Sequence, residues 1–270
     1  MADEGASILS FTKVSLAFAG LHALDNVSFD VRPGELYAII GPNGAGKTSI
    51  FNCISRVYRP QNGSIAFDGR DLMTMKRHEV AAAGIARTFQ NVELFQQLTV
   101  VDNLMLGRHH LMRTGIVRGG IWIGPAKREE TEHRARVEQI IDFLEIEAIR
   151  QMPVATLPYG LQKRVELGRA LAMEPKLLLL DEPVAGMNLE ETEDLARFIL
   201  DIKEELGIAQ IMVDHDMGVV MDIADRVLVL DFGRVISQGV PAVVQRDPAV
   251  IEAYLGVEEL PGAASSGKRR

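Results

Sequence analysis

The sequence predicts an α/β fold whose core is interrupted by an inserted helical segment. Strand-like and helix-like segments alternate through the first 90 residues and again from residue 177 onward. Between these two stretches, residues 91–152 show no clear strand pattern and follow helical spacing. Alternating strands and helices are typical of a mainly parallel sheet covered by helices. We therefore expect one core built from two stretches of chain that are distant in the sequence.

The first stretch begins with strand patterns and reaches a glycine-rich turn. The predicted elements are strands at residues 8–16, 27–31 and 36–40, a helix at 49–58, a turn and short strand within 59–69, and a helix at 76–83. The apolar strand at 36–40 leads directly through the glycine-rich turn into the helix. Strand, glycine-rich turn and helix in this order form a phosphate-binding unit.

The inserted segment carries an amphipathic helix. Its apolar residues Val137, Ile140, Ile141 and Leu144 follow the i, i+3, i+4, i+7 spacing that places them on one face. The charged run that precedes them is interpreted as the solvated face of the same helix. Residues 107–125 are glycine-rich and apolar and include the only tryptophan. We interpret them as a surface excursion.

The α/β pattern returns with a run of four leucines, which suits a central parallel strand. The elements predicted after it are helix 189–206, strand 208–214, helix 217–223, strands 226–230 and 234–239, and helix 247–256. The small and polar residues 257–270 are expected to be a disordered tail.

Composition excludes several classes of protein. A formal net charge of −8 argues against a protein that binds nucleic acid through a basic surface. The single cysteine, Cys53, cannot form an internal disulfide and is interpreted as a small buried apolar residue. The polar, acidic N-terminus does not resemble a signal peptide. The sequence has no run of 18 apolar residues, so it predicts no membrane-spanning helix. We expect a cytoplasmic protein whose membrane role, if any, comes through a partner.

The segment GPNGAGKT matches the phosphate-binding pattern G-x-x-x-x-G-K-[ST] in full. Its glycines let backbone N–H groups approach a phosphate, Lys47 reaches the β- and γ-phosphate oxygens, and the Thr48 hydroxyl can bind Mg²⁺. The predicted nucleotide contacts are Gly41, Pro42, Asn43, Gly44, Ala45, Gly46, Lys47, Thr48 and Ser49. The preceding strand and the following helix provide the context that this pattern requires.

A pair of acidic residues follows the leucine-rich strand. Asp181 stands at the carboxyl end of the strand, where doubly wound folds bind their ligands, and is predicted to bind Mg²⁺. Glu182 comes next and is placed to polarise an attacking water. An apolar run that ends in two acids is a weak signal alone, but it becomes strong beside a complete phosphate-binding loop.

Two further polar residues lie at junctions of the predicted core. Gln90 ends the segment ARTFQ where the helical insertion begins, and its amide can contact Mg²⁺ or the attacking water. His215 directly follows a predicted strand and can donate to the γ-phosphate. Either residue alone is more often an ordinary loop residue, whereas the ordered set favours a nucleotide-hydrolysing site.

The order of these motifs resembles the ATP-binding subunits of ABC transporters over nearly the whole chain. The resemblance identifies Gly41–Thr48 as the Walker A loop, Gln90 as the Q-loop glutamine, Asp181 as the Walker B aspartate, Glu182 as the catalytic glutamate and His215 as the switch histidine. It also identifies Phe18 as the aromatic residue that stacks on adenine, residues 157–161 as the signature, and the segment AGMN at 185–188 as a D-loop variant.

The resemblance implies a fold and a set of cofactors. It implies a P-loop NTPase (RecA-like) core with an antiparallel β subdomain and an inserted α-helical subdomain. One ABC domain then spans residues 8–256, its ATP-binding core formed by 1–90 and 161–240 and its helical subdomain by 91–160. Residues 241–256 become a C-terminal helical extension. The implied cofactors are ATP and Mg²⁺, the metal being bound by Thr48, Gln90 and Asp181.

A narrower resemblance points to the LivG-type subunits of branched-chain amino-acid importers. It is carried by YAIIGPNGAGKT, GIARTFQNVELFQQLTVVDNL, the tyrosine of LPYG, DEPVAGMN, DHDMGVVM and DPAVIEAYLG. It implies transmembrane permease subunits, a second ABC ATPase and a periplasmic or lipoprotein solute-binding protein as partners. It also implies a peripheral location on the inner face of the cell membrane. Importers of urea or other amides and lipid exporters share much of this pattern and remain alternatives.

The signature departs from the pattern of the family. The usual sequences are L-S-G-G-Q and L-S-Y-G-Q, whereas this chain has Leu157, Pro158, Tyr159, Gly160 and Leu161. In the family, the signature of one subunit closes on the nucleotide held by the Walker A loop of the other. Proline is tolerated in the first turn of a helix, whose positive end still faces phosphate. The hydroxyl donor of the serine is lost, so we expect this chain to bind the γ-phosphate of its partner's nucleotide more weakly.

Three other interpretations remain open from the sequence. A non-transport ABC protein, such as an ATP-gated clamp, commonly has two cassettes or a long coiled coil, and neither pattern occurs in this sequence. A P-loop kinase transfers phosphate to an acceptor, which Glu182 and His215 beside an ABC-like signature do not favour. A protein that binds ATP but barely hydrolyses it is suggested by Pro158 and Leu161. The leading interpretation is an ATP-hydrolysing motor subunit of a transporter.

Overall fold

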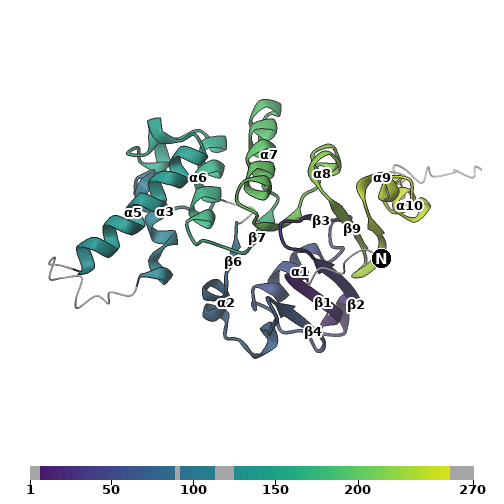
Figure 1. The fold of residues 1–270 in the computed structure, drawn as a ribbon. Coiled ribbons are helices and arrows are strands. Elements are labelled where there is room, and N and C mark those ends of the chain that lie inside the picture. Colours follow the sequence, from purple (N-terminus) through teal and green to yellow (C-terminus); the bar gives the residue numbers. More distant parts are fainter. Residues whose placement is uncertain (1–6, 89–91, 113–124, 256–270) are drawn as a thin grey trace, which may run out of the picture.

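The computed structural model describes residues 7–88, 92–112 and 125–255. These residues form two β-sheets, a set of helices on one face of the larger sheet, and a helical region at its edge (Figure 1). The predicted α/β fold class is confirmed.

The larger sheet has six strands. Their order is β10 (Arg234–Gly239), β9 (Arg226–Asp231), β3 (Leu36–Ile40), β8 (Ala209–Val213), β7 (Leu177–Asp181) and β6 (Ile85–Arg87). The pairs from β9 to β6 are parallel, and only β10 runs antiparallel to its neighbour. Every residue of β3, β7 and β8 is buried. Such continuous apolar strands are typical of a parallel sheet covered on both faces.

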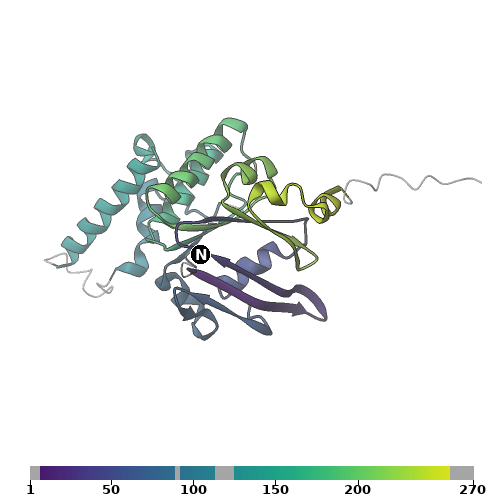
Figure 2. The same ribbon diagram turned by 45° about the vertical axis from the view of Figure 1, so that its right-hand side comes forward.

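The smaller sheet is antiparallel. It contains, in order, β2 (Leu21–Val31), β1 (Leu9–Phe18), β4 (Asn62–Phe67) and β5 (Arg70–Asp71). It lies on one side of the larger sheet, and helices α7 (Leu189–Glu204) and α8 (Met217–Ile223) lie on the other (Figures 1 and 2).

Helix α1 (Lys47–Ile54) packs between the two sheets. Its buried residues Ile50, Phe51 and Ile54 share one apolar cluster with residues of both sheets. Cys53 is fully buried in the same cluster, where burial raises the pKa of its thiol to about 12. The cysteine is therefore an inert core residue, as its isolation in the sequence indicated.

The helical region forms at the β6 edge of the larger sheet. It consists of α3 (Val100–Gly107), α5 (Pro125–Phe143) and α6 (Tyr159–Leu171) with short 3₁₀ turns at His109–Leu111, Glu147–Ile149 and Val154–Thr156. Val137, Ile141 and Leu144 from the predicted apolar stripe are fully buried and pack in one cluster with Leu104 of α3 and Val165 of α6. Burial of that stripe holds the three helices together.

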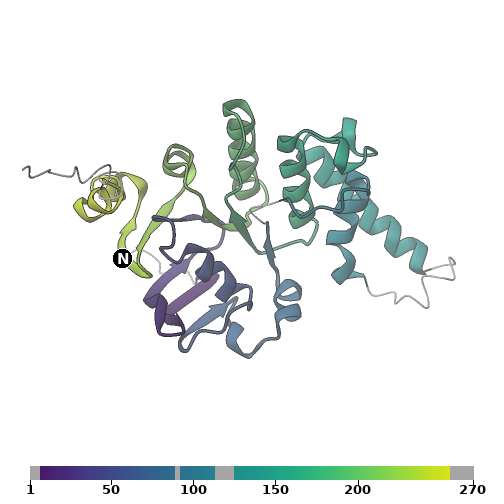
Figure 3. The same cartoon turned by 180° about the vertical axis from the view of Figure 1, so that it is seen from behind.

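The C-terminal helices lie at the opposite end of the molecule. Helices α9 (Pro241–Val244) and α10 (Pro248–Leu255) follow β10, and α3, α5 and α6 lie beyond β6 (Figures 1 and 3). Among the described residues, the helices not yet mentioned are α2 (Arg77–Ala83) and a 3₁₀ turn at Leu72–Thr74.

Several predicted boundaries were wrong. The second strand begins at Leu21 instead of residue 27, because it pairs with β1 from the hairpin turn onward. The predicted helix at 49–58 begins at Lys47 and ends at Ile54. It cannot continue to residue 58, because Arg56 has a positive φ of 58°. Strand β6 and helix α9 were not predicted, since each is too short for a periodic pattern. Most of the predicted 107–125 excursion and the predicted tail at 257–270 lie outside the described residues.

Candidate active site

The phosphate-binding loop connects β3 to α1. Gly41, Gly44 and Gly46 have φ angles of 149°, 83° and 108°. A Cβ atom on Gly41 would overlap the carbonyl group of Leu230, and one on Gly46 would lie 2.5 Å from the carbonyl oxygen of Ala23. Glycine is therefore required at 41 and 46 by both backbone conformation and close packing.

The remaining loop residues leave a surface open to a ligand. In this loop only Ala45 is buried. The half-buried residues are Gly41, Pro42, Gly46, Lys47 and Ser49, and the exposed residues are Asn43, Gly44 and Thr48. Gly46 caps α1, and the first turn of the helix contains no acidic residue. The N–H groups and the positive end of this helix are thus available to an anion.

Lys47 folds back over the loop that precedes it. Its Nζ atom donates to the carbonyl oxygens of Gly41, at 2.6 Å, and Pro42, at 3.0 Å. Burial lowers the pKa of the ammonium group, and the carboxylates of Glu182 and Asp181 oppose that shift. The cation therefore lies within the electrostatic reach of both predicted acidic residues.

Asp181 ends β7 and is bound by an arginine that the sequence did not single out. The Arg87 Nη2 atom lies 2.7 Å from Asp181 Oδ2, and Arg87 Nη1 donates to Asn52 Oδ1 at 2.9 Å. Arg87 is the last residue of β6, and Asn52 lies on α1. A buried carboxylate beside the loop needs a positively charged partner. The only feature of the sequence that could have indicated Arg87 is its position three residues before Gln90.

Glu182 occupies an unusual backbone conformation directly after β7. Its φ is 48°, and its N–H donates to the Val213 carbonyl oxygen at 2.7 Å. This bond ties the end of β7 to the end of β8. A positive φ on a residue other than glycine is uncommon and is held here by the surrounding sheet. The His215 Nδ1 atom lies 3.8 Å from Glu182 Oε2.

Asp214 organises the turn that carries His215. The Asp214 carboxylate is buried and accepts hydrogen bonds from the backbone N–H groups of His215, at 2.7 Å, and Asp216, at 3.0 Å. Its second oxygen accepts a long hydrogen bond from the Val184 N–H at 3.4 Å. Burial raises the pKa of this carboxyl, and the three backbone donors oppose the rise. No role was predicted for Asp214 from the sequence, although it ends the predicted strand at 208–214.

Phe18 lies at the end of β1 and is half exposed. Its ring packs edge-on against Tyr58, with 5.0 Å between the ring centroids. The relative exposure of Phe18 is 46%, so one side of the ring is free to contact a planar base.

The C-terminal helix reaches the phosphate-binding loop. The Tyr254 hydroxyl of α10 accepts a hydrogen bond from the Gly41 backbone N–H, and burial raises the pKa of this hydroxyl to about 12. The segment DPAVIEAYLG was noted in the sequence only as part of a resemblance. Its tyrosine therefore connects helix α10 to the first glycine of the loop.

The signature residues begin α6. Pro158 is the N-cap residue rather than the first helical residue, and its side chain makes no capping hydrogen bond. Its carbonyl oxygen still accepts the first helical bond, from the Gln162 N–H at 3.0 Å. Leu157 and Gly160 are buried, Leu161 is half-buried against the main apolar cluster, and Pro158 and Tyr159 are exposed. The helix thus starts normally but offers no hydroxyl at its cap.

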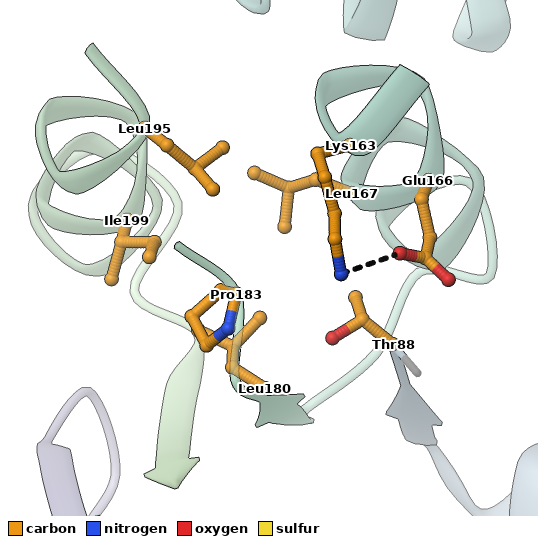
Figure 4. Close-up of a pocket in the computed structure, with 8 residues that line it drawn as sticks. All are labelled: Thr88, Lys163, Glu166, Leu167, Leu180, Pro183, Leu195 and Ile199. Atoms are coloured by element: carbon orange, nitrogen blue, oxygen red, sulfur yellow. Dashed lines mark ion pairs between the residues drawn. The ribbon is translucent and has the colours of Figure 1, made fainter. Parts of the chain in front are cut away.

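A buried ion pair lies behind the signature. Lys163 Nζ is 3.6 Å from Glu166 Oε2, and both side chains are almost fully buried. The pair lines a small cavity of about 10 Å³ between α6, α7 and β7, which Thr88, Leu180 and Pro183 also line (Figure 4). That volume holds at most one water molecule, so the cavity is not a ligand site.

Some predictions cannot be placed on the structure. Gln90 lies outside the described residues. Within residues 7–88, 92–112 and 125–255, no helix is long and apolar enough to cross a membrane. In the same part of the chain no group of three or more His, Cys, Asp or Glu side chains is arranged to hold a metal ion.

Comparisons with known proteins identify the family of this chain. Residues 24–185 match the ABC transporter family, and residues 234–259 match a C-terminal family described as branched-chain amino acid ATP-binding cassette transporter. The high-affinity branched-chain amino acid transport ATP-binding protein BraF of Pseudomonas aeruginosa is 35% identical over 92% of this chain and 98% of its own length. Protein LivG of Escherichia coli, with the same description, is 34% identical over the same shares.

Solved structures show the same fold. The ADP conformation of MJ1267, an ATP-binding cassette of an ABC transporter, superimposes with a TM-score of 0.81. It is 29% identical in sequence and covers 93% of this chain and 99% of the cassette. Because the family model spans more than half of the sequence and the relatives are 34–35% identical over 92% of it, the chain belongs to the ABC transporter family of ATP-binding subunits.

Proposed function

We propose that this ATPase is the motor subunit of an importer of branched-chain amino acids. The observation that carries the solute class is the match of residues 234–259 to the C-terminal family of branched-chain amino acid cassettes. That segment includes Tyr254, which contacts the phosphate-binding loop, so it is part of the working site. The two full-length relatives carry the same transport description.

The nucleotide is bound by the loop at 41–49. Its N–H groups and the end of α1 surround the β-phosphate, Lys47 reaches the outer phosphates, and Phe18 stacks on the base. Lys47 already lies over Gly41 and Pro42 and must turn outward to meet the phosphates. The lowered pKa of its ammonium reflects burial, which an anionic ligand would offset.

The residues present fit Mg²⁺ held together with the phosphates. Thr48 supplies a hydroxyl at the start of α1, Asp181 supplies a carboxylate at the end of β7, and Gln90 is assigned the third position by resemblance. Oxygen donors from few side chains suit Mg²⁺, which is usually bound by one or two protein ligands plus substrate phosphates. When bound, the ion neutralises charge that develops on the transferred phosphoryl group.

Glu182 and His215 supply the hydrolytic chemistry. Glu182 accepts the proton of the attacking water. Its backbone is fixed by the hydrogen bond to Val213, which keeps the residue at the carboxyl ends of β7 and β8. His215 lies 3.8 Å from that carboxylate on a turn fixed by Asp214, from which it donates to the γ-phosphate. Both residues follow strands at the carboxyl edge of the sheet, where this class of fold binds ligands.

The altered signature argues for an unequal pair of ATPases. Pro158 has neither an N–H nor a hydroxyl to offer the nucleotide of a second subunit. The motifs assigned to this chain's own site follow the family pattern in the sequence. A non-identical partner with an intact signature makes this chain's site the faster of the two.

The architecture supports a division of labour within the chain. We propose that residues 1–90 and 161–240 form the ATP-binding core, that 91–160 form the helical subdomain that contacts a permease, and that 241–256 form an extension supporting the loop. The chain then lies on the inner face of the cell membrane, attached through permease subunits that receive solute from a binding protein.

Uptake in cells tests this proposal. We expect deletion of the gene to abolish high-affinity leucine uptake, with recovery from wild-type protein and none from the Glu182→Gln variant. Glu190→Gln removes an exposed carboxylate of α7 and is a matched control that should restore uptake. Loss of urea uptake or of lipid export instead of leucine uptake would reassign the solute. Unchanged transport of all three would favour a non-transport ATPase.

A further inference from the structure

Arg87 joins three elements around the carboxylate of Asp181. It ends β6, its Nη2 atom lies 2.7 Å from Asp181 Oδ2 on β7, and its Nη1 atom donates to Asn52 Oδ1 on α1 at 2.9 Å. The guanidinium carbon lies 5.4 Å from the centre of the Phe51 ring. Two acceptors and an aromatic face therefore fix this cation in one place.

The same arrangement places Arg87 beside the proposed metal ligands. Asn52 follows Thr48 by four residues on α1, so both side chains lie on one face of the helix. The guanidinium thus lies between the helix face that carries the Thr48 hydroxyl and the carboxylate that ends β7.

Burial makes this ion pair strong. The side chains of Arg87 and Asp181 are only 13% and 10% exposed. Water screens such charges poorly, so a second cation at the same carboxylate is repelled by the first.

We propose that Arg87 is the resident counter-ion of Asp181 and that a divalent cation must compete with it. Without nucleotide, the guanidinium holds the carboxylate and the site retains metal weakly. The phosphates of a bound nucleotide add the negative charge that lets both cations share the site. Metal binding is thereby coupled to nucleotide binding. This inference rests on the proposed role of Asp181 as a metal ligand.

Metal binding without nucleotide tests the inference directly. The probe is Mn²⁺ alone, titrated into the full chain and followed by electron paramagnetic resonance. We expect Arg87→Met to bind Mn²⁺ about tenfold more tightly than wild type, because a neutral side chain leaves the carboxylate to the metal. Arg87→Lys keeps the charge and should stay within about twofold of wild type. Unchanged or weaker binding by Arg87→Met would overturn the inference.

Two further variants separate the possible causes of failure. Arg164→Met is a matched control, since Arg164 also pairs with an aspartate, Asp194, and lies over a phenylalanine ring, but on α6 and α7. It should leave Mn²⁺ binding unchanged, and tighter binding by this control would overturn the inference. Asp181→Asn should abolish Mn²⁺ binding; if it does not, the metal assignment under the proposed function is wrong as well.

A stability measurement gives a second readout. Removal of Arg87 takes away the cation that is paired directly with the buried carboxylate of Asp181, so Arg87→Met should melt at a lower temperature than wild type in metal-free buffer. Mn²⁺ alone should raise its melting temperature more than that of wild type. If Arg87→Met does not fold, Arg87→Gln is smaller and neutral and is measured in the same way. An equal rise in both proteins would contradict the competition.

Discussion

The Nδ1 atom of His215 lies 3.8 Å from Oε2 of Glu182, although the two residues are 33 positions apart in the sequence. The two residues follow neighbouring parallel strands, and the backbone bond from Glu182 to Val213 fixes the distance between the strand ends. The residues proposed as base and donor are thereby held close together at one edge of the sheet.

The Glu182→Gln variant should hydrolyse ATP at least about 100-fold more slowly than wild type, the range that loss of a general base produces. ATP should still bind and hold the subunits together, because the amide keeps the shape of the side chain. Steady-state phosphate release and size-exclusion chromatography with ATP measure the two effects. Wild-type turnover by this variant would exclude Glu182 as the base, and Glu190→Gln serves as the control for loss of a carboxylate.

The Pro158→Ser variant should speed the partner's site and leave this chain's own site unchanged. The serine restores a hydroxyl at the cap of α6, and a hydrogen bond to a charged phosphate is worth about 1.5–3 kcal/mol, or roughly 10- to 100-fold in rate. Turnover of the assembled complex is measured with Glu182→Gln on this chain, so that only the partner's site is active. Unchanged turnover would show that the signature of this chain does not limit the rate.

The Tyr254→Phe variant should bind ATP about 2- to 10-fold more weakly. It removes the acceptor for the Gly41 N–H and leaves the ring in place, and a neutral hydrogen bond contributes about 0.5–1.5 kcal/mol. Calorimetric titration with ATP measures the change. Ile251→Ala, at an exposed position of the same helix, is the control. Equal affinities for Tyr254→Phe and wild type would show that α10 does not support the loop.

The Lys163→Met variant should lower the free energy of unfolding by about 3–5 kcal/mol, because it removes the cation paired with the buried carboxylate of Glu166. The double variant Lys163→Met, Glu166→Leu should recover most of that loss. Urea denaturation of the two variants and wild type provides the comparison. A double variant no more stable than the single one would mean that Lys163 stabilises the fold through other contacts.

His133 should make the protein less stable in mild acid. Burial and the neighbouring Arg108, whose Nε atom donates to the ring at 2.8 Å, lower the pKa of His133 below its ordinary value of 6.5. Glu129, Glu132 and Glu174 oppose that shift. The unfolded chain therefore takes up a proton near pH 6.5 while the folded ring stays neutral. Stability is complete above this pH and falls as the pH drops below it.

The His133→Gln variant keeps a neutral acceptor for Arg108 and removes the titrating group. Its free energy of unfolding should fall less than that of wild type between pH 7.5 and pH 5, as measured by urea denaturation at each pH. Parallel curves for the two proteins would show that His133 does not carry this dependence.

The sequence by itself determined the fold class and the central elements of the site. Motifs confined to a few neighbouring residues, such as Gly41–Thr48 and Asp181–Glu182, were visible because their chemistry depends on local spacing. The strands at 36–40 and 226–231 and the helix at 217–223 were predicted closely, since long periodic or apolar runs dominate them.

Only the tertiary structure decided which distant residues support those motifs. Arg87 contacts both Asp181 and Asn52, and Tyr254 contacts Gly41. The partners in each of these contacts are separated by tens of residues or more in the sequence, and no local pattern indicates such contacts. The strand β6 has three residues and exists because β7 provides its hydrogen-bond partners. Pairing between strands and burial of charges depend on neighbours that only the folded chain brings together. The sequence therefore predicted the candidate reactive groups but not the residues that hold them in place.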